Sequence, residues 1–298
     1  MDNQKLYDYD SAYSYCRKKA ISHYENFPVG SLLIPKNKRK FIYSIYAFAR
    51  YADDIADSAE FTKEEKIRRL SLLNNELDKI CKDNEYFSED DSDKIFIALS
   101  DTVKSLEIPV KEFRDLIKAF VQDSEGYTYK DFEELIEYSR KSANPIGHLV
   151  LYIFGYKPED SEESKKIFDY SDKICTALQL TNFWQDVSED IRIRRIYIPS
   201  EIMKEFKYSA EMLYSGTENE DFRKMIRHLV ERTRKLFTEG SEILNFTKGR
   251  LRLELKATVS GGQEILNKIE KINYNVLRRR PVLNKSDKLK IITGLIFK

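Results

Sequence analysis

The segment 50–57, with the sequence Arg-Tyr-Ala-Asp-Asp-Ile-Ala-Asp, carries acidic side chains at the spacing of one helix face. Asp53 and Asp57 are four positions apart, so they share one side of an α-helix. Tyr46 and Arg50 continue that side toward the N-terminus, whereas alanines and isoleucines lie nearer the opposite side. We call Tyr46, Arg50, Asp53 and Asp57 the first stripe.

A second segment repeats this arrangement on a more apolar helix. Spacings of three, four and four residues align four polar side chains, which we call the second stripe: Gln179, Asn182, Asp186 and Asp190. Apolar residues, among them Leu180, Phe183 and Trp184, surround this stripe. We therefore expect the helix to be mostly buried and to carry its carboxylates inward.

Carboxylates at this spacing require a positive partner. Like charges one helical turn apart oppose helix formation by about 0.2–0.5 kcal/mol, and burial without a partner costs much more. Arg50 offsets one charge, but the two stripe segments hold at least five carboxylates. Mg²⁺ prefers hard oxygen ligands and is typically bound through a few carboxylates plus substrate phosphate oxygens. Two such helices facing across a cavity would form a diphosphate site built through metal ions. The predicted metal ligands are Asp53, Asp57, Asn182, Asp186 and Asp190.

An alternative is that each stripe is a solvated helix face that pairs with nearby Lys or Arg. For the first stripe alone, this interpretation is as good as the metal site. For the second stripe the apolar surroundings, with Trp184, count against it, because a buried carboxylate needs a partner inside the protein. No His or Cys cluster competes for the metal assignment.

Basic residues follow the second stripe directly. Arg192, Arg194 and Arg195 are succeeded by Tyr197. Guanidinium groups at this place are expected to hold a leaving diphosphate as it gains charge. The plain alternative for each of them is a cation that stabilises a helix C-terminus.

The elements that position these residues are predicted to be helices throughout. Only 10 Gly and 7 Pro occur in 298 residues, which favours long helices over a many-turned β fold. Helix starts are indicated at Thr62, Asp131 and Ser161, and a disturbance is expected at Asn144-Pro145. The predicted helices cover about 9–24, 38–57, 62–81, 93–106, 109–124, 131 onward, 161–190, 218–246 and 250–278.

One domain, residues 1–298, is predicted. The chain shows no repeat of fixed period and no low-complexity linker, and the acidic stretch 81–93 is expected to be an exposed loop. The helices on either side of that loop are amphipathic, so we expect them to bury their apolar faces against each other. The pair Gly261-Gly262 is expected to weaken or bend the helix 250–278.

Composition excludes several classes of protein. The 51 basic and 50 acidic side chains nearly cancel, so a net charge of +1 argues against a nucleic-acid partner. Cys16, Cys81 and Cys175 lie far apart, which argues against a disulfide framework or a zinc site and fits a reducing compartment. An apolar signal region and a run of about 20 apolar residues are both missing, so a cytoplasmic location is expected.

The C-terminal tail, about 287–298, mixes apolar residues with lysines and follows the basic run Arg278–Arg280. Such a segment can rest on a membrane surface as a peripheral contact. The alternative is that it packs on its own domain.

These residues resemble those of the squalene/phytoene synthase family. Both aspartate motifs match, DDIAD at 53–57 and NFWQDVSED at 182–190. The segment HYENFP at 23–28 matches the family's N-terminal His-x-x-x-Phe region, and RRIYIP at 194–199 is the family segment after the second motif. The resemblance extends over almost the whole chain.

The resemblance implies an all-α fold, a single isoprenoid-synthase-type helical bundle around a central apolar cavity. It implies that His23 and Phe27 flank the diphosphate and that Tyr46 and Arg50 contact the substrate. The other predicted substrate-binding residues are Tyr138, Asn144, Gln179, Asn182, Gln185, Arg195 and Tyr197.

Four further sequence segments are most similar to those of the hopanoid-pathway branch of the family. The hydroxysqualene synthase of that branch converts presqualene diphosphate to hydroxysqualene. The similar segments are HYENFP, SANPIG, LQLTNFWQD and VLRRRPVL. Family members that condense two prenyl diphosphates usually carry Arg where this chain has Gln185, and a GVAG-like segment in place of 142–145. Both departures count against condensation of two farnesyl diphosphates.

The hypothesis that follows is ionisation of presqualene diphosphate with several Mg²⁺ ions, with Arg50 and Arg195 adding positive charge. Aromatic faces stabilise cations without attacking them; the candidates are Phe27, Tyr46, Tyr138 and Phe183. Water then captures the rearranged cation, so no NADPH is expected. Asn144 or Gln185 would position that water, unless each is only a packing or capping group. His148 and His228 are expected to be structural.

Three alternatives to this hypothesis remain open. One is a condensing squalene, dehydrosqualene or phytoene synthase that acts on farnesyl diphosphate or a longer prenyl diphosphate. Another is a non-catalytic relative of the assembly-factor kind, and a third is a structural helical protein with coincidental stripes. The hydroxysqualene hypothesis also implies a functional partner, a synthase that makes presqualene diphosphate.

Overall fold

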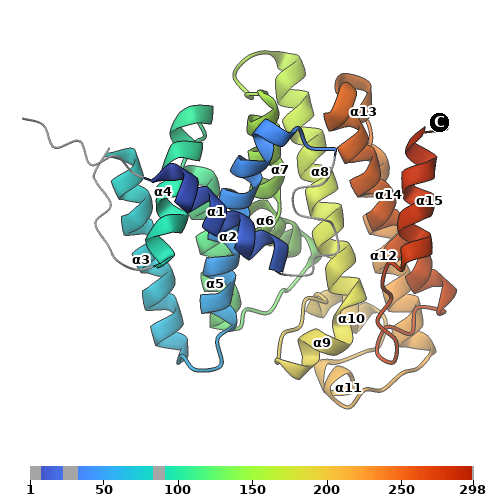
Figure 1. Ribbon diagram of the computed structural model, residues 1–298. Coiled ribbons are helices and arrows are strands. Elements are labelled where there is room, and N and C mark those ends of the chain that lie inside the picture. Colours follow the sequence, from blue (N-terminus) through green and yellow to red (C-terminus); the bar gives the residue numbers. More distant parts are fainter. Residues whose placement is uncertain (1–7, 23–32, 83–90, 297–298) are drawn as a thin grey trace, which may run out of the picture. The chain divides into compact units, whose positions relative to one another are not determined.

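Every regular element among the described residues is a helix, which confirms the predicted all-α class. The computed structural model describes residues 8–22, 33–82 and 91–296. The chain forms two compact units: residues 1–125 with 149–157, and residues 126–148 with 158–298. Figure 1 shows the helices of both units and their labels. None of the described helices has the length and apolar character needed to cross a membrane.

The first unit is built around α2 (Arg39–Asp57). The other elements of this unit are α1 (Tyr9–Ser22), η1 (Lys36–Lys38), α3 (Lys63–Cys81), α4 (Asp91–Leu106) and α5 (Lys111–Glu125). α2 packs against all of them, and its buried Phe48 meets the rings of Phe96 and Phe113 edge-on at 6.2 and 5.3 Å. A buried hydrogen bond of 2.7 Å between Ser44 and Thr102 also joins α2 to α4. These contacts bury one side of α2 and orient the other.

The second unit is built around α8 (Glu162–Gln185), which runs beside α12 (Glu220–Gly240) and α14 (Gly249–Lys271) (Figure 1). Its remaining helices are α6 (Phe132–Ser142), α9 (Val187–Arg192), α10 (Ser200–Glu205), α11 (Ala210–Tyr214), α13 (Ile243–Phe246) and α15 (Lys285–Ile296). Trp184 of α8 is fully buried, and its Nε1 donates to Thr233 Oγ1 at 2.8 Å. α7 (Asn144–Phe154) begins in this unit and ends in the first.

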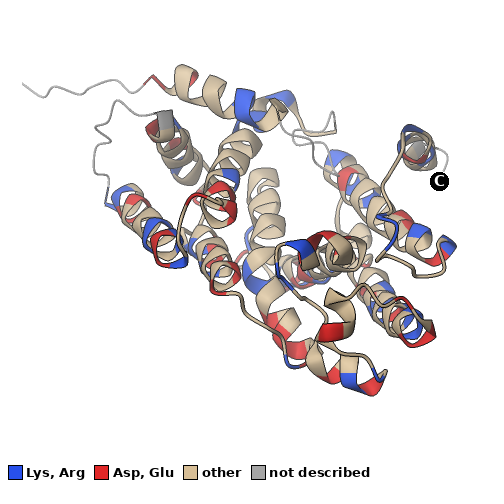
Figure 2. Ribbon diagram, turned by 90° about the horizontal axis from the view of Figure 1, so that it is seen from below, with Lys and Arg blue, Asp and Glu red and all other residues tan. Residues whose placement is uncertain are grey.

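Local capping signals set the helix starts that the sequence predicted. Thr62, Asp131 and Ser161 each accept a hydrogen bond from the backbone amide three residues later. Such a contact satisfies one of the amides that a helix start leaves without a partner. Basic and acidic segments are both spread over the helices rather than gathered by sign, consistent with the near-zero net charge (Figure 2).

Several predicted boundaries are wrong. The helix predicted to run to residue 190 ends at Gln185, and α9 follows after a break at Asp186. The helix predicted over 218–246 divides into α12 and α13, and the one predicted to reach 278 ends at Lys271. The short helices α10 and α11 were not anticipated. The end of the first predicted helix and most of the 81–93 loop lie outside the described residues.

The pair Gly261-Gly262, expected to weaken or bend its helix, does not interrupt α14, which continues through both residues. A Cβ atom on Gly262 would lie 2.4 Å from Cζ of Phe237 and 2.9 Å from Cδ2 of Leu178. The glycine therefore permits close packing of α14 on α12 and α8. Helix propensity is outweighed here by the space that this packing requires.

Candidate functional site

The first stripe lies on α2, on the side away from the unit's buried Ala52, Ile55 and Ala56. Arg50 binds both acidic neighbours: Nη1 lies 3.0 Å from Oδ2 of Asp53, and Nε lies 2.8 Å from Oδ1 of Asp54. The side chains of Arg50 and Asp53 are each about one-third exposed, 33% and 34%. Asp57 is exposed and Tyr46 is half-buried. The stripe thus presents accessible carboxylate oxygens beside a guanidinium group.

The second stripe crosses the break between α8 and α9. Asp186 leaves helical geometry, with φ −106° and ψ 12°. Two backbone hydrogen bonds of 2.9 Å still bridge the break, from Asp186 N to Asn182 O and from Asp190 N to Asp186 O. The four-residue spacing of Asn182, Asp186 and Asp190 is therefore kept, although one regular helix does not carry it. Gln179, Asn182, Asp186 and Asp190 are all half-buried.

Asp186 is held by an arginine that the sequence alone did not assign to the site. Arg280 binds it with both nitrogens of its fork, Nε to Oδ1 at 2.6 Å and Nη2 to Oδ2 at 3.1 Å. Two parallel charge-assisted hydrogen bonds of this kind are strong and directional. Arg280 belongs to the basic run that precedes the C-terminal tail. In the sequence Arg280 is marked only by the VLRRRPVL segment, which does not indicate that its partner is Asp186.

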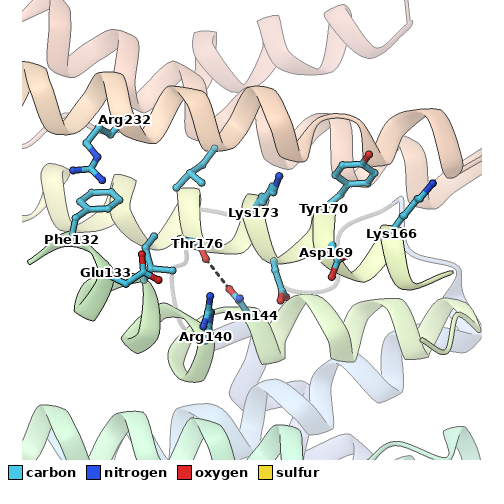
Figure 3. Close-up of a pocket in the computed structure, with 13 residues that line it drawn as sticks. Phe132, Glu133, Arg140, Asn144, Lys166, Asp169, Tyr170, Lys173, Thr176 and Arg232 are labelled. Carbon is cyan, nitrogen blue, oxygen red and sulfur yellow. Dashed lines mark hydrogen bonds between the residues drawn. The ribbon is translucent and has the colours of Figure 1, made fainter. Parts of the chain in front are cut away.

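Gln185 and Asn144, the two departures from the condensing pattern, are both buried and hydrogen-bonded. Gln185 is 0% exposed, and its Nε2 donates to the carbonyl oxygen of Pro281 at 2.5 Å. Its Oε1 receives no hydrogen bond from the described residues. Asn144 is 3% exposed and its Oδ1 accepts from Thr176 Oγ1 at 3.0 Å, marked by the dashed line in Figure 3.

Aromatic side chains of the second unit gather beside the second stripe. Phe183 stacks on Tyr197 with ring centroids 3.8 Å apart and planes at 10°. Tyr138 lies 6.0 Å from each of these two rings. All three residues are buried. The structure therefore brings the predicted residues Tyr138 and Tyr197 together with Phe183.

Asp190 and Arg195 share a small cavity with Phe183 and Tyr197. Its volume is about 10 Å³, close to the space that one water molecule needs. The turn that precedes Arg195 places Arg194 in the left-handed region, with φ 60°. That conformation is uncommon for a residue with a side chain, and it lets Arg195 N donate to Asp190 O at 2.8 Å. Of the three arginines predicted here, only Arg195 lines this cavity.

The other two arginines, Arg192 and Arg194, do not line this cavity and lie at or just after the C-terminus of α9. Arg192 is the last residue of α9 and pairs with Glu189 at 2.8 Å, and Arg194 is exposed. The two described histidines, expected to be structural, have ion-pair or ring contacts with neighbouring side chains. His148 pairs with Asp172 at 2.6 Å, and the His228 ring lies against Phe206.

The segment around Asn144 packs closely on α8. A Cβ atom on Gly147 would lie 2.5 Å from both Cys175 Sγ and Ser171 Oγ. Burial raises the pKa of the Cys175 thiol to about 12, so this cysteine remains protonated near neutral pH. A protonated thiol is a poor nucleophile, so Cys175 acts here as a packing residue.

A cavity of about 640 Å³ lies among α6, α8 and α12 and does not include the stripe carboxylates (Figure 3). Its lining combines acidic, basic and aromatic side chains, and Arg232 covers the ring of Phe132 at 3.7 Å. Asn144 reaches it, whereas Tyr138, Gln185 and Asp186 do not line it. The stripe carboxylates and the aromatic group around Tyr138 therefore lie outside this cavity.

The donor set of the stripes suits Mg²⁺ better than a softer metal. Within the described part of the chain, no group of three or more His, Cys, Asp or Glu side chains gathers into a complete metal cage. Each stripe instead offers carboxylate oxygens that are partly exposed. Mg²⁺ usually keeps several waters and uses one or two carboxylates plus substrate phosphates, so this arrangement fits it. His23 and Phe27 lie outside the described residues.

Comparison with known proteins gives a consistent result. The family model described as squalene/phytoene synthase matches residues 21–287. The crystal structure of squalene synthase HpnC from Alicyclobacillus acidocaldarius superimposes with a TM-score of 0.80 at 33% identity. That match covers 91% of this chain and 97% of the other.

Curated sequences give a similar match. The 15-cis-phytoene synthase of Synechococcus elongatus is 28% identical over 284 residues, 93% of this chain and 90% of that protein. Chloroplastic phytoene synthase 1 of Solanum lycopersicum is also 28% identical, over 93% of this chain. The chain spans 66% of the length of that tomato protein.

Proposed function

The chain belongs to the squalene/phytoene synthase family, and we propose that it converts presqualene diphosphate to hydroxysqualene with Mg²⁺. The observation that carries this proposal is the second stripe. Asp186 follows the mostly buried helix α8 and Asp190 lies on α9, and Arg280 and Arg195 bring guanidinium groups to their neighbourhood. Carboxylates for metal ions and cations for phosphate oxygens are the groups that diphosphate ionisation needs.

The proposed reaction begins with heterolysis of the bond between carbon and the diphosphate oxygen. The diphosphate leaves with the electron pair, and the carbon skeleton becomes a cyclopropylcarbinyl cation. Mg²⁺, when bound by Asp53, Asp57, Asn182, Asp186 and Asp190, would neutralise the charge that develops on the leaving group. Arg50, Arg195 and Arg280 would hold diphosphate oxygens and so disfavour recombination.

The cation then rearranges, and water adds to it with loss of one proton. The reaction balances as presqualene diphosphate plus water giving hydroxysqualene and diphosphate, without a reductant. Tyr46, Tyr138 and Phe183 are the aromatic candidates for stabilising the cation. Gln185 Oε1 and Asn144 are the candidates for orienting the water. An acceptor oxygen binds an O–H of water and leaves the water's lone pair for the cation, and Gln185 Oε1 receives no hydrogen bond from the described residues.

One observation favours this reaction over condensation. Gln185 is a neutral residue bound to a backbone carbonyl, at a position where condensing members usually carry Arg. The HpnC protein, which shares 33% identity with this chain, is described as a squalene synthase, and the cyanobacterial and tomato phytoene synthases share 28%, so all three carry the names of condensing enzymes. Those phytoene synthase relatives make a condensing activity the second candidate, with two prenyl diphosphates as substrates.

The test is product analysis by mass spectrometry on the purified protein with Mg²⁺ and without NADPH. We expect hydroxysqualene from presqualene diphosphate and no C30 product from farnesyl diphosphate. A protein in which Asp53 and Asp57 are both replaced by Asn serves as the inactive control. A condensation product from farnesyl or geranylgeranyl diphosphate would instead establish the second candidate.

We also propose that α15 contacts a membrane surface. Leu289 and Ile292, one turn apart, are 62% and 54% exposed. Asp287, the acidic residue of this helix, is buried and lies 2.7 Å from Lys268 Nζ. The helix therefore offers apolar side chains and lysines to its exterior, a pattern typical of an interfacial helix. An enzyme with an apolar C30 product would benefit from such a location.

A further inference from the structure

The segment 276–283 is a strap that crosses the break in the second stripe. It lies between the end of α14 and the start of α15 and has no regular secondary structure of its own. Buried residues hold both of its ends, Val276 at 0% exposure and Leu283 at 7%. Arg278, Arg279 and Arg280 lie between these anchors and are exposed.

Two neighbouring residues of the strap contact two neighbouring residues at the break. Arg280 binds Asp186 through both oxygens, and Pro281 accepts a hydrogen bond from Gln185 Nε2 at 2.5 Å. Each pair is more than 90 residues apart in the chain, 94 and 96 respectively. The contacts are therefore consecutive on both partners, and one of them attaches the backbone directly beside the arginine.

The backbone at Arg280 is restricted from its other side as well. A proline fixes its own φ near −65° and disfavours helical geometry for the residue before it. Pro281 is buried, so this restriction acts on a residue that packing already holds in place. Only the side chain of Arg280 retains freedom, because the amide of Gln185 fixes the carbonyl immediately after it.

We propose that Gln185 is a positioning residue that holds Arg280 at the second stripe through the Pro281 carbonyl. The inference rests on the proposed function, in which Arg280 is a diphosphate ligand. In the structure Arg280 pairs with Asp186; a metal held by Asp186 would compete with this pair, and the guanidinium would then be available to phosphate oxygens close by. The Gln185 amide keeps the strap in place during that exchange, so only the side chain of Arg280 moves.

The residue type fits this role. Gln185 is fully buried, and an amide provides an N–H donor for a carbonyl oxygen without placing a charge in that site. A methionine has nearly the same shape and no donor. A glutamate would direct a negative oxygen at the Pro281 carbonyl, and its buried charge would be costly.

The test is a double-mutant cycle read by isothermal titration calorimetry of inorganic diphosphate in the presence of Mg²⁺. Gln185→Met should weaken binding about three- to tenfold, the effect of one hydrogen bond. Arg280→Met should weaken it about tenfold or more, since it removes a charged ligand. In the Arg280→Met protein, adding Gln185→Met should change the affinity less than about twofold, because the positioned group is gone.

A matched control is Thr181→Val on the same helix. The Thr181 hydroxyl is also buried, but it donates to Ala177 O within α8, so its loss should leave diphosphate affinity unchanged. Hydrogen exchange of the 276–283 peptide gives a second readout. Exchange should rise in Gln185→Met and stay unchanged in Thr181→Val.

If Gln185→Met does not fold, Pro281→Ala tests the same idea from the strap. It keeps the carbonyl acceptor, frees the backbone of Arg280, and should weaken binding only when Arg280 is present. Equal losses with and without Arg280, or no loss in either background, would overturn the positioning role. Failure of the unmodified protein to bind diphosphate with Mg²⁺ would instead overturn the proposed function itself.

Discussion

At the level of single residues, the second stripe depends on Asp186, which binds Arg280 in the structure and is a proposed metal ligand. Asp186 is 26% exposed and is bound on both oxygens by Arg280. The same oxygens are the proposed metal ligands, and the guanidinium supplies the charged partner that a partly buried carboxylate requires. The charge of Asp186, more than its shape, is the property on which the proposed chemistry depends.

We therefore expect Asp186→Asn to lower the rate of diphosphate release at least about 100-fold, as the loss of a group that stabilises developing charge does elsewhere. The substitution keeps the side-chain shape, so the thermal unfolding temperature should change little. Glu189→Gln removes a nearby acid that pairs with Arg192 and should retain most of the activity. Comparable losses of activity in both proteins would show that activity depends on negative charge anywhere near α9 and not on the stripe carboxylate.

At the level of helices, close approach in the second unit depends on glycine. Gly240 and Gly262 both lie where a Cβ atom would be within 3.0 Å of a neighbouring helix. Phe237 and Leu266 in the same region are fully buried, so the surrounding side chains have little space into which to move. α8, α12 and α14 thus pack at distances that larger residues would prevent.

Gly262→Ala is expected to destabilise the protein by about 1–3 kcal/mol, the usual cost of overpacking a core. Helix propensity alone predicts the opposite sign, a gain of about 1 kcal/mol. A Cβ atom on Gly294 of α15 would meet no described atom within 4 Å, so Gly294→Ala is the matched control and should be neutral or slightly stabilising. Denaturant unfolding of both variants measures the difference, and a stabilised Gly262→Ala protein would refute the packing explanation.

At the level of the whole molecule, net charge cannot direct the protein to an anionic surface, because 51 basic and 50 acidic residues nearly balance. Any membrane affinity must therefore come from a local surface. The exposed side of α15 combines Leu289 and Ile292 with Lys285 and Lys290. Its contacts with α14 hold the opposite side in the second unit.

Replacing Leu289 and Ile292 together by Ser should reduce binding to vesicles that contain anionic lipid by about tenfold or more, because two apolar side chains no longer enter the interface. Cosedimentation measures this binding. Ile193→Ser is the control, since Ile193 is 57% exposed at the end of α9 and the net charge is unchanged in both proteins. Equal binding of all three proteins would remove α15 as a membrane contact.

Features that depend on residues three or four positions apart could be predicted from the amino-acid sequence. The all-α class, the helix starts at Thr62, Asp131 and Ser161, and the carboxylate spacing of both stripes follow from such local relations. The family motifs added the identity of the fold, which the structural comparison confirmed. The assignment of metal ligands stays a prediction, as do the single domain and its central cavity.

Only the folded chain shows which distant residues complete the second stripe. The break at Asp186, the approach of Arg280, and the contact between Gln185 and Pro281 bring together positions more than 90 residues apart. Local spacing cannot specify such pairs, because they depend on how the strap returns after α14. Gly262 illustrates the same limit: its sequence context indicated a weakened or bent helix, whereas only the folded chain shows that it is a contact residue between three packed helices.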